Sequence, residues 1–140
     1  MILRCNFEEL GALRRGAHSF LGDGPGGGGR VVAPPEGREE VLALLPRLSG
    51  DLVLETLADQ RRVLKAVSVI VSSLKEEMDV SVIAAHPADE AAVSAYFLYA
   101  HALAVLNRLS EIGEEMEALI EVVTGSPATL QVAATFRFPD

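Results

Sequence analysis

Residues 98–123 read LYAHALAVLNRLSEIGEEMEALIEVV, and this stretch decides the fold. Its apolar residues recur at alternating steps of four and three, the spacing typical of a helix that packs along another helix. This seam consists of Leu98, Ala102, Val105, Leu109, Ile112, Met116, Leu119 and Val123. Pro87 stands where a helix can begin and Thr124-Gly125 where it can end, so the pattern predicts one helix over residues 87–124.

A second seam with the same spacing lies earlier in the chain and predicts another long helix, over about residues 52–85. Either Asp51 or Thr56 can cap its start, and Thr56 has Asp59 three residues later, as in a capping box. The members of this seam are Val53, Leu57, Gln60, Leu64, Val67, Val71, Leu74 and Met78, of which one, Gln60, is polar.

Two parts of the earlier pattern leave the type of element open. Residues 66–72 contain a run of β-branched side chains that is also compatible with a buried strand, although the flanking heptads favour a helix. Residues 79–85 can continue the helix or form a short extended piece.

The connection between the two long patterns is short, so we expect the helices to pack as an antiparallel hairpin. A turn near residue 86 would place Leu64 opposite Leu109. The same register brings Arg61 and Arg62 level with Glu111 and Glu114, where opposite charges attract.

Three short segments are predicted to be strands, and the last of them is the clearest, because its apolar residues alternate regularly along the chain. They span residues 1–6, 30–33 and 129–138, and they are expected to form a small mixed sheet. Together with the long hairpin they predict an α+β protein that is predominantly helical. We expect residues 1–140 to form a single domain, because this length is usual for one domain.

Two shorter helices complete the expected fold. The first has Asn6 as its N-cap and Glu9 as the other half of a capping box. The second opens at Pro35, and Pro46 must kink or end it. Between these helices lies a glycine-rich loop at residues 22–29. It matches a dinucleotide-binding spacing, but a helix precedes it where that motif needs a strand, so we interpret it as a connector.

Composition excludes several classes of protein. The chain has 140 residues, a formal net charge of −8 and one cysteine, Cys5. The acidic balance argues against nucleic-acid binding, which needs a basic face. The most apolar stretch, residues 91–106, is shorter than the ~20 residues of a membrane span. With no apolar leader at its N-terminus, the chain is expected to be cytoplasmic and not bound to membranes.

Each long helix carries a second apolar stripe that the hairpin does not use. Such a stripe needs another partner, either the strand layer of the same chain or a second copy of the chain. Three short strands are little cover for helices of this length, so we expect a homodimer or a higher homo-oligomer. The stripes consist of Val93, Phe97, Ala100 and Ala104 on the later helix and of Val63, Ala66 and Ile70 on the earlier one.

Polar residues on the later helix are candidates for a ligand site. Tyr96, His101, Arg108 and Glu111 are the groups that could line a pocket between helices or subunits. The nearby glutamates are interpreted as a solvated face, so no metal site is predicted. No motif points to a cofactor, and no catalytic set can be named from spacing. Cys5 is interpreted as a small buried apolar residue.

Two functional hypotheses follow from the sequence. The first is a non-catalytic interaction module that assembles with copies of itself through apolar helix faces. The alternative is a small-molecule or metal-dependent enzyme with a site between helices or subunits.

Overall fold

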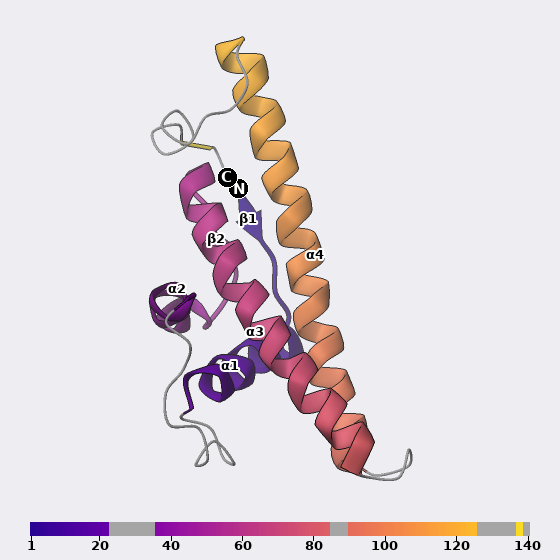
Figure 1. The fold of residues 1–140 in the computed structure, drawn as a ribbon. Helices are drawn as coiled ribbons and strands as arrows, with labels where there is room; N and C mark the ends of the chain where they lie inside the picture. Colours follow the sequence, from indigo (N-terminus) through magenta and orange to yellow (C-terminus); the bar gives the residue numbers. More distant parts are fainter. Residues whose placement is uncertain (23–35, 85–89, 126–136, 139–140) are drawn as a thin grey trace.

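The computed structural model describes residues 1–22, 36–84, 90–125 and 137–138. Two long helices dominate it, α3 (Leu57–Ala84) and α4 (Glu90–Thr124), and they run antiparallel (Figure 1). The predicted hairpin and the predominantly helical α+β class are confirmed. Both segments of uncertain type are helical as far as residue 84.

The helix α3 begins later than the heptad pattern predicts. The Thr56 hydroxyl accepts a hydrogen bond of 3.0 Å from the Asp59 amide, so Thr56 caps the helix and Asp51 does not. Residues 52–54, assigned above to the helix, are extended instead. Leu52 and Leu54 are buried whereas Val53 is 42% exposed, which is the alternation of a strand. Three residues are too few for that alternation to be recognised beside a heptad pattern.

The extended segment pairs with the N-terminus. β1 (Ile2–Leu3) and β2 (Leu52–Val53) form an antiparallel pair with Leu3 opposite Leu52. Met1 and Leu54 continue the pair, because the Met1 ammonium donates to the Leu54 carbonyl at 2.8 Å. The described sheet is thus antiparallel and two-stranded. The predicted strands at 30–33 and most of 129–138 lie outside the described residues.

Phe138 fixes the end of the chain beside the start of α3. Its amide donates to the Glu55 carbonyl at 2.9 Å, and its side chain is buried in the core. Arg137 pairs with the Glu55 carboxylate at 2.7 Å. Residues 137–138 therefore lie next to the residues that follow β2, as neighbours of the small sheet.

The first of the two shorter helices forms where the sequence predicts it, but the second begins at Arg38, three residues after the predicted start, because Gly37 caps it in the left-handed conformation with φ 85°. In α1 (Phe7–Leu21) the Asn6 side chain and Glu9 form the expected capping box, and Gly22 ends the helix with φ 82°. The second helix, α2 (Arg38–Leu44), passes at Pro46 into the 3-10 turn η2 (Leu45–Arg47). Most of the glycine-rich loop, residues 23–29, lies outside the described residues.

Both short helices pack against α3 and cover its second apolar stripe. Val63 is 3% exposed, and Ala66 and Ile70 are fully buried. Gly16 of α1, which has no side chain, lies against Ile70 and Leu74. This corrects the expectation that Val63 and Ile70 belong to a subunit interface, because α1 and α2 of the same chain already bury this side of α3.

A buried glutamine fixes the register of the hairpin. Gln60 of α3 is 2% exposed, and its amide nitrogen donates to the Leu109 carbonyl of α4 at 2.9 Å. Its side chain also lies against Gly113, where a Cβ would come within 2.6 Å of the amide nitrogen. The predicted register differs from the observed one by about one turn. Gln60 and not Leu64 contacts Leu109, and Arg61 pairs with Glu117 and not with Glu111 or Glu114.

The seam of α4 turns away from α3 toward its C-terminal end. Leu109 and Met116 are fully buried, but Leu119 is 40% exposed and Val123 is 62% exposed, while Ile120 is buried instead. A straight helix has 3.6 residues per turn, so a strict 3.5-residue pattern rotates off the contact line. No helix among the described residues is long and apolar enough to cross a membrane.

Candidate functional site

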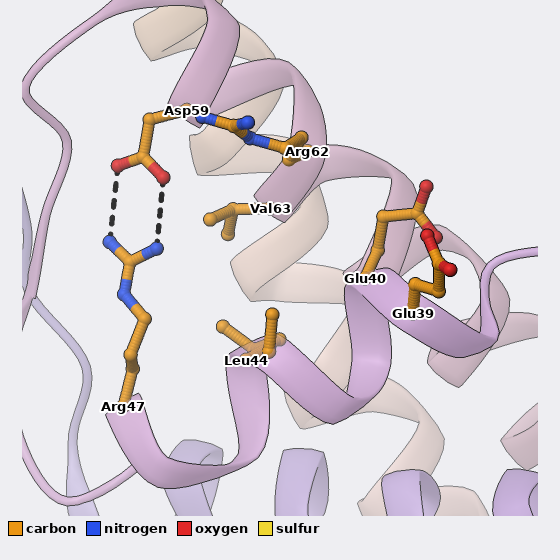
Figure 2. Close-up of a pocket in the computed structure, with 8 residues that line it drawn as sticks. Glu39, Glu40, Leu44, Arg47, Asp59, Arg62 and Val63 are labelled. Carbon is orange, nitrogen blue, oxygen red and sulfur yellow. Dashed lines mark hydrogen bonds and ion pairs between the residues drawn. The ribbon is translucent and has the colours of Figure 1, made fainter.

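A cavity of about 260 Å³ lies between α2 with η2 and the first turns of α3 (Figure 2). Leu44 and Val63 form its floor, and both side chains are nearly inaccessible to solvent. One wall is the ion pair of Arg47 with Asp59. The Arg47 guanidinium donates to both Asp59 oxygens, at 2.9 and 3.2 Å, and also to the Val53 carbonyl at 2.9 Å.

The rim of this cavity carries charges of both signs. Glu39 and Glu40 reach it from the first turn of α2, and Arg62 reaches it from α3 (Figure 2). The Glu40 carboxylate lies 3.7 Å from the Lys65 ammonium. An apolar floor with a few charged groups around it is the usual composition of a small-molecule site.

This cavity is not predictable from the sequence. Its residues come from 39–47 and 59–63, two separate segments whose spacing along the chain carries no recognisable motif. Their approach depends on how α2 and η2 pack on α3. The only local signal is the adjacent acidic pair Glu39-Glu40, which by itself is typical of an exposed helix start.

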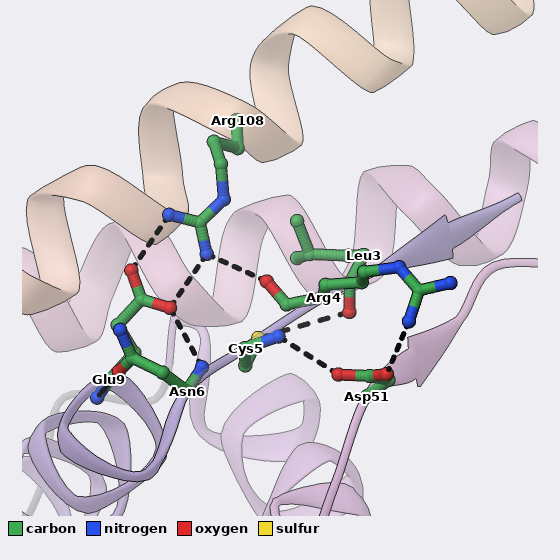
Figure 3. A network of polar contacts seen from close by, with 7 residues as sticks. All are labelled: Leu3, Arg4, Cys5, Asn6, Glu9, Asp51 and Arg108. Atoms are coloured by element: carbon green, nitrogen blue, oxygen red, sulfur yellow. Dashed lines mark hydrogen bonds and ion pairs between the residues drawn. The ribbon is translucent and has the colours of Figure 1, made fainter.

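A second polar cluster joins the N-terminal segment to α4 (Figure 3). The Arg108 guanidinium donates to the two Glu9 oxygens at 2.7 and 2.8 Å and to the Arg4 carbonyl at 2.8 Å. The Glu9 side chain is only 8% exposed. Asp51 completes the cluster by accepting the Cys5 amide hydrogen at 3.0 Å.

The electrostatics of this cluster follow from the Arg108–Glu9 pair. The hydrogen bond from Arg108 lowers the pKa of Glu9, against the opposing effect of burial, and His101 adds a smaller favourable charge interaction. The same bond raises the pKa of Arg108. Burial raises the pKa of the Cys5 thiol, and the Glu9 carboxylate adds to that increase. A half-buried thiol with a raised pKa is a poor nucleophile, so the geometry indicates a structural cluster.

The four candidate ligand residues of α4 do not converge. Arg108 is bonded to Glu9, whereas Tyr96 is 56% exposed and Glu111 is exposed. Tyr96 and Arg108 are twelve residues apart, which is ~18 Å along a helix. Arg108 is held by Glu9 and by the Arg4 carbonyl and is therefore not free to bind a ligand. Within the described ranges, no group of three or more His, Cys, Asp or Glu could hold a metal ion.

The second apolar stripe of α4 is more exposed to solvent than that of α3. Val93 is 42% exposed and Phe97 is 55% exposed, while Ala100 and Ala104 are partly buried. Phe97 contacts Tyr96 edge to face, with ring centroids 5.8 Å apart. The surface formed by Val93, Tyr96, Phe97, Ala100 and Ala104 is called the outer face of α4 below.

Comparison with known proteins adds no further information. The chain matches no protein-family model, no curated protein and no solved structure.

Proposed function

We propose that this protein is a non-catalytic interaction module whose copies assemble through the outer face of α4. The observation that carries the proposal is the exposure of Val93, Tyr96 and Phe97 side by side on one helix. Each large apolar side chain left in water forgoes roughly 1.5–3 kcal/mol of burial. Aromatic residues of this kind commonly contribute most of the binding free energy of an interface.

The distribution of charge favours a second copy as the partner. Residues 91–107 contain no Asp, Glu, Lys or Arg, although part of this segment faces solvent. Further along α4 the exposed surface is acidic, with Glu111, Glu114 and Glu115. Two copies with a net charge of −8 each repel one another, and the uncharged segment is where they can approach.

A two-fold axis through the outer face gives the simplest arrangement. Two α4 helices that cross near Ala100 and Ala104 can approach closely because these side chains are small. The same crossing directs the acidic C-terminal halves of the two helices away from each other. The uncharged segment is only ~25 Å long, so the interface is small and the dimer should dissociate at about micromolar concentrations.

Sedimentation velocity from about 1 to about 500 µM tests the proposal. The wild-type protein is expected to change from monomer to dimer within this range. Phe97→Asp should weaken the dimer by at least ~100-fold, because it places a charge in the centre of the contact. A wild-type protein that stays monomeric at the highest concentration would contradict the proposal.

Val122→Asp is the matched control. Val122 is on the same helix and is 81% exposed, but it lies beyond the uncharged segment. Its substitution should leave the dimer unchanged. If both variants weaken the dimer equally, net charge and not the outer face controls assembly. Circular dichroism of both variants verifies that the fold is kept.

A further inference from the structure

Three of the five charged residues that line the α2–α3 cavity have a partner within the chain, namely Arg47, Asp59 and Glu40. Of the two cations that line it, Arg47 pairs with Asp59, and the neighbouring Arg61 and Lys65 of α3 pair with Glu117 and with Glu36 and Glu40. Arg62 differs from these, because it forms no ion pair or hydrogen bond with any described residue.

One carboxylate on the opposite side is also unmatched. Glu40 has Lys65 nearby, but Glu39 forms no ion pair or hydrogen bond within the part of the chain that the structure describes. Figure 2 shows that Arg62 extends along α3 toward the side of Asp59, whereas the Glu39 and Glu40 carboxylates gather at the α2 side. The two unmatched charges therefore stand on different sides of the apolar floor.

We infer that this cavity binds a small zwitterion whose cationic and anionic groups are joined by a short apolar chain. The cationic group lies at Glu39, the anionic group at Arg62, and the chain between them rests on Leu44 and Val63. A guanidinium suits a carboxylate because it can donate two parallel hydrogen bonds. The volume of about 260 Å³ accommodates a molecule of this size. Neither the outer face of α4 nor its assembly enters this inference.

The probes are three molecules that share one chain length. 6-Aminohexanoate carries both charges, hexanoate carries the anion alone, and hexylammonium carries the cation alone. Each is titrated into ¹⁵N-labelled full-length protein while amide chemical shifts are recorded. We expect 6-aminohexanoate to shift the amides of residues 39–47 and 59–63, with a Kd on the order of 1 mM. Hexanoate and hexylammonium should each bind more weakly by at least about threefold, since each leaves one rim charge without a partner.

Two variants separate the ends of the site. Arg62→Gln should weaken 6-aminohexanoate and hexanoate by about fivefold and leave hexylammonium unchanged. Glu39→Gln should weaken 6-aminohexanoate and hexylammonium by a similar factor and leave hexanoate unchanged. Arg15→Gln and Glu115→Gln remove exposed charges of the same signs elsewhere, so they should leave all three titrations unaffected.

Three results would overturn the inference. In the first, none of the probes shifts the amides of the cavity. In the second, the shifts occur but are equal in Arg62→Gln, Glu39→Gln and the control variants, which would mean that the rim charges do not recognise the ligand. In the third, hexanoate binds as tightly as 6-aminohexanoate, which would make the cavity a simple anion site.

Discussion

The Glu9 carboxylate performs two tasks in this chain. One of its oxygens accepts the Asn6 amide hydrogen at 2.9 Å and so completes the cap of α1. Both oxygens also accept hydrogen bonds from Arg108 of α4. Because Glu9 is nearly inaccessible to solvent, removing Arg108 alone would leave a buried charge without a partner, which is costly. The pair therefore fixes where the first helix sits on α4.

The charge of Glu9 can be tested with Glu9→Gln, because glutamine can still accept the capping hydrogen bond. The pKa of Glu9 is lowered in the fold from its ordinary value of 4.5. A carboxyl with a lowered folded pKa stabilises the fold above its unfolded pKa and loses that effect as pH falls through the folded pKa. Glu9→Gln should therefore destabilise the protein by about 1–3 kcal/mol at pH 7, and the difference from wild type should shrink below about pH 4.5.

Urea unfolding at pH 7, 4.5 and 3 measures this difference. Glu8→Gln is the control, since Glu8 is an exposed carboxylate in the same helical turn and should not show the same dependence. A difference between wild type and Glu9→Gln that stays constant from pH 7 to pH 3 would show that Glu9 contributes only through its shape and its cap.

At the scale of elements, α1 contains two glycines that look equivalent in sequence. Each weakens a helix by up to ~1 kcal/mol relative to alanine. The structure separates them. A Cβ at Gly16 would come within 2.5 Å of the Ile70 side chain and 2.9 Å of the Leu74 side chain, whereas a Cβ at Gly11 would meet nothing within 4 Å. Gly16 is thus required for the contact of α1 with α3, and Gly11 is not.

Alanine substitution should therefore change stability in opposite directions at the two positions. Gly11→Ala is expected to raise the free energy of unfolding by about 0.5–1 kcal/mol through helix propensity. Gly16→Ala is expected to lower it by about 1–3 kcal/mol, because the added methyl overpacks the contact with Ile70 and Leu74. Thermal and urea unfolding of both variants provide the measurement. If both substitutions raise the free energy of unfolding, α1 can move away from α3 without a loss of stability.

The sequence predicts the helix starts correctly where residues close to one another in the chain determine them. The cap of α1 depends on Asn6 and Glu9, and that of α3 on Thr56 and Asp59, all within three residues of one another. The helix–helix seam also repeats over several turns, so it is visible in the sequence. The extended residues 52–54 were missed because their structure depends on pairing with the N-terminus, about fifty residues away.

The candidate sites were less predictable for the same reason. The sequence predicts Arg108 as a ligand-site residue, but in the structure it pairs with Glu9, which is 99 positions away along the chain and had a sufficient local explanation as a cap. The α2–α3 cavity joins Arg47 to Asp59 across a turn and a strand. Spacing cannot indicate such contacts, because they arise only when α2, η2 and α3 pack.

At the scale of the whole molecule, α4 is longer than the helix that packs along it, α3. With 35 residues against the 28 of α3, its last turns extend beyond the start of α3 (Figure 1). Val122 and Val123 are mostly exposed there, whereas Ala102, Val105 and Leu109 are fully buried. Helical hydrogen bonds alone hold a helix end only weakly, because most helical stability in proteins comes from packing. The two parts of this helix should therefore differ in stability.

Amide hydrogen exchange can measure that difference. The amides of residues 105–116 are expected to exchange only through global unfolding, because the core of the hairpin packs on them. The amides of residues 121–124 should exchange at least ~100-fold faster, through fraying of the exposed end.

Recording exchange at a low and at a high protein concentration provides the control. The outer face proposed for assembly lies at the other end of α4, so a dimer should leave the exchange of residues 121–124 unchanged. Slow exchange there at both concentrations would mean that this end is held within the subunit, and slowing only at high concentration would mean that copies meet at this end of α4 and not near Phe97.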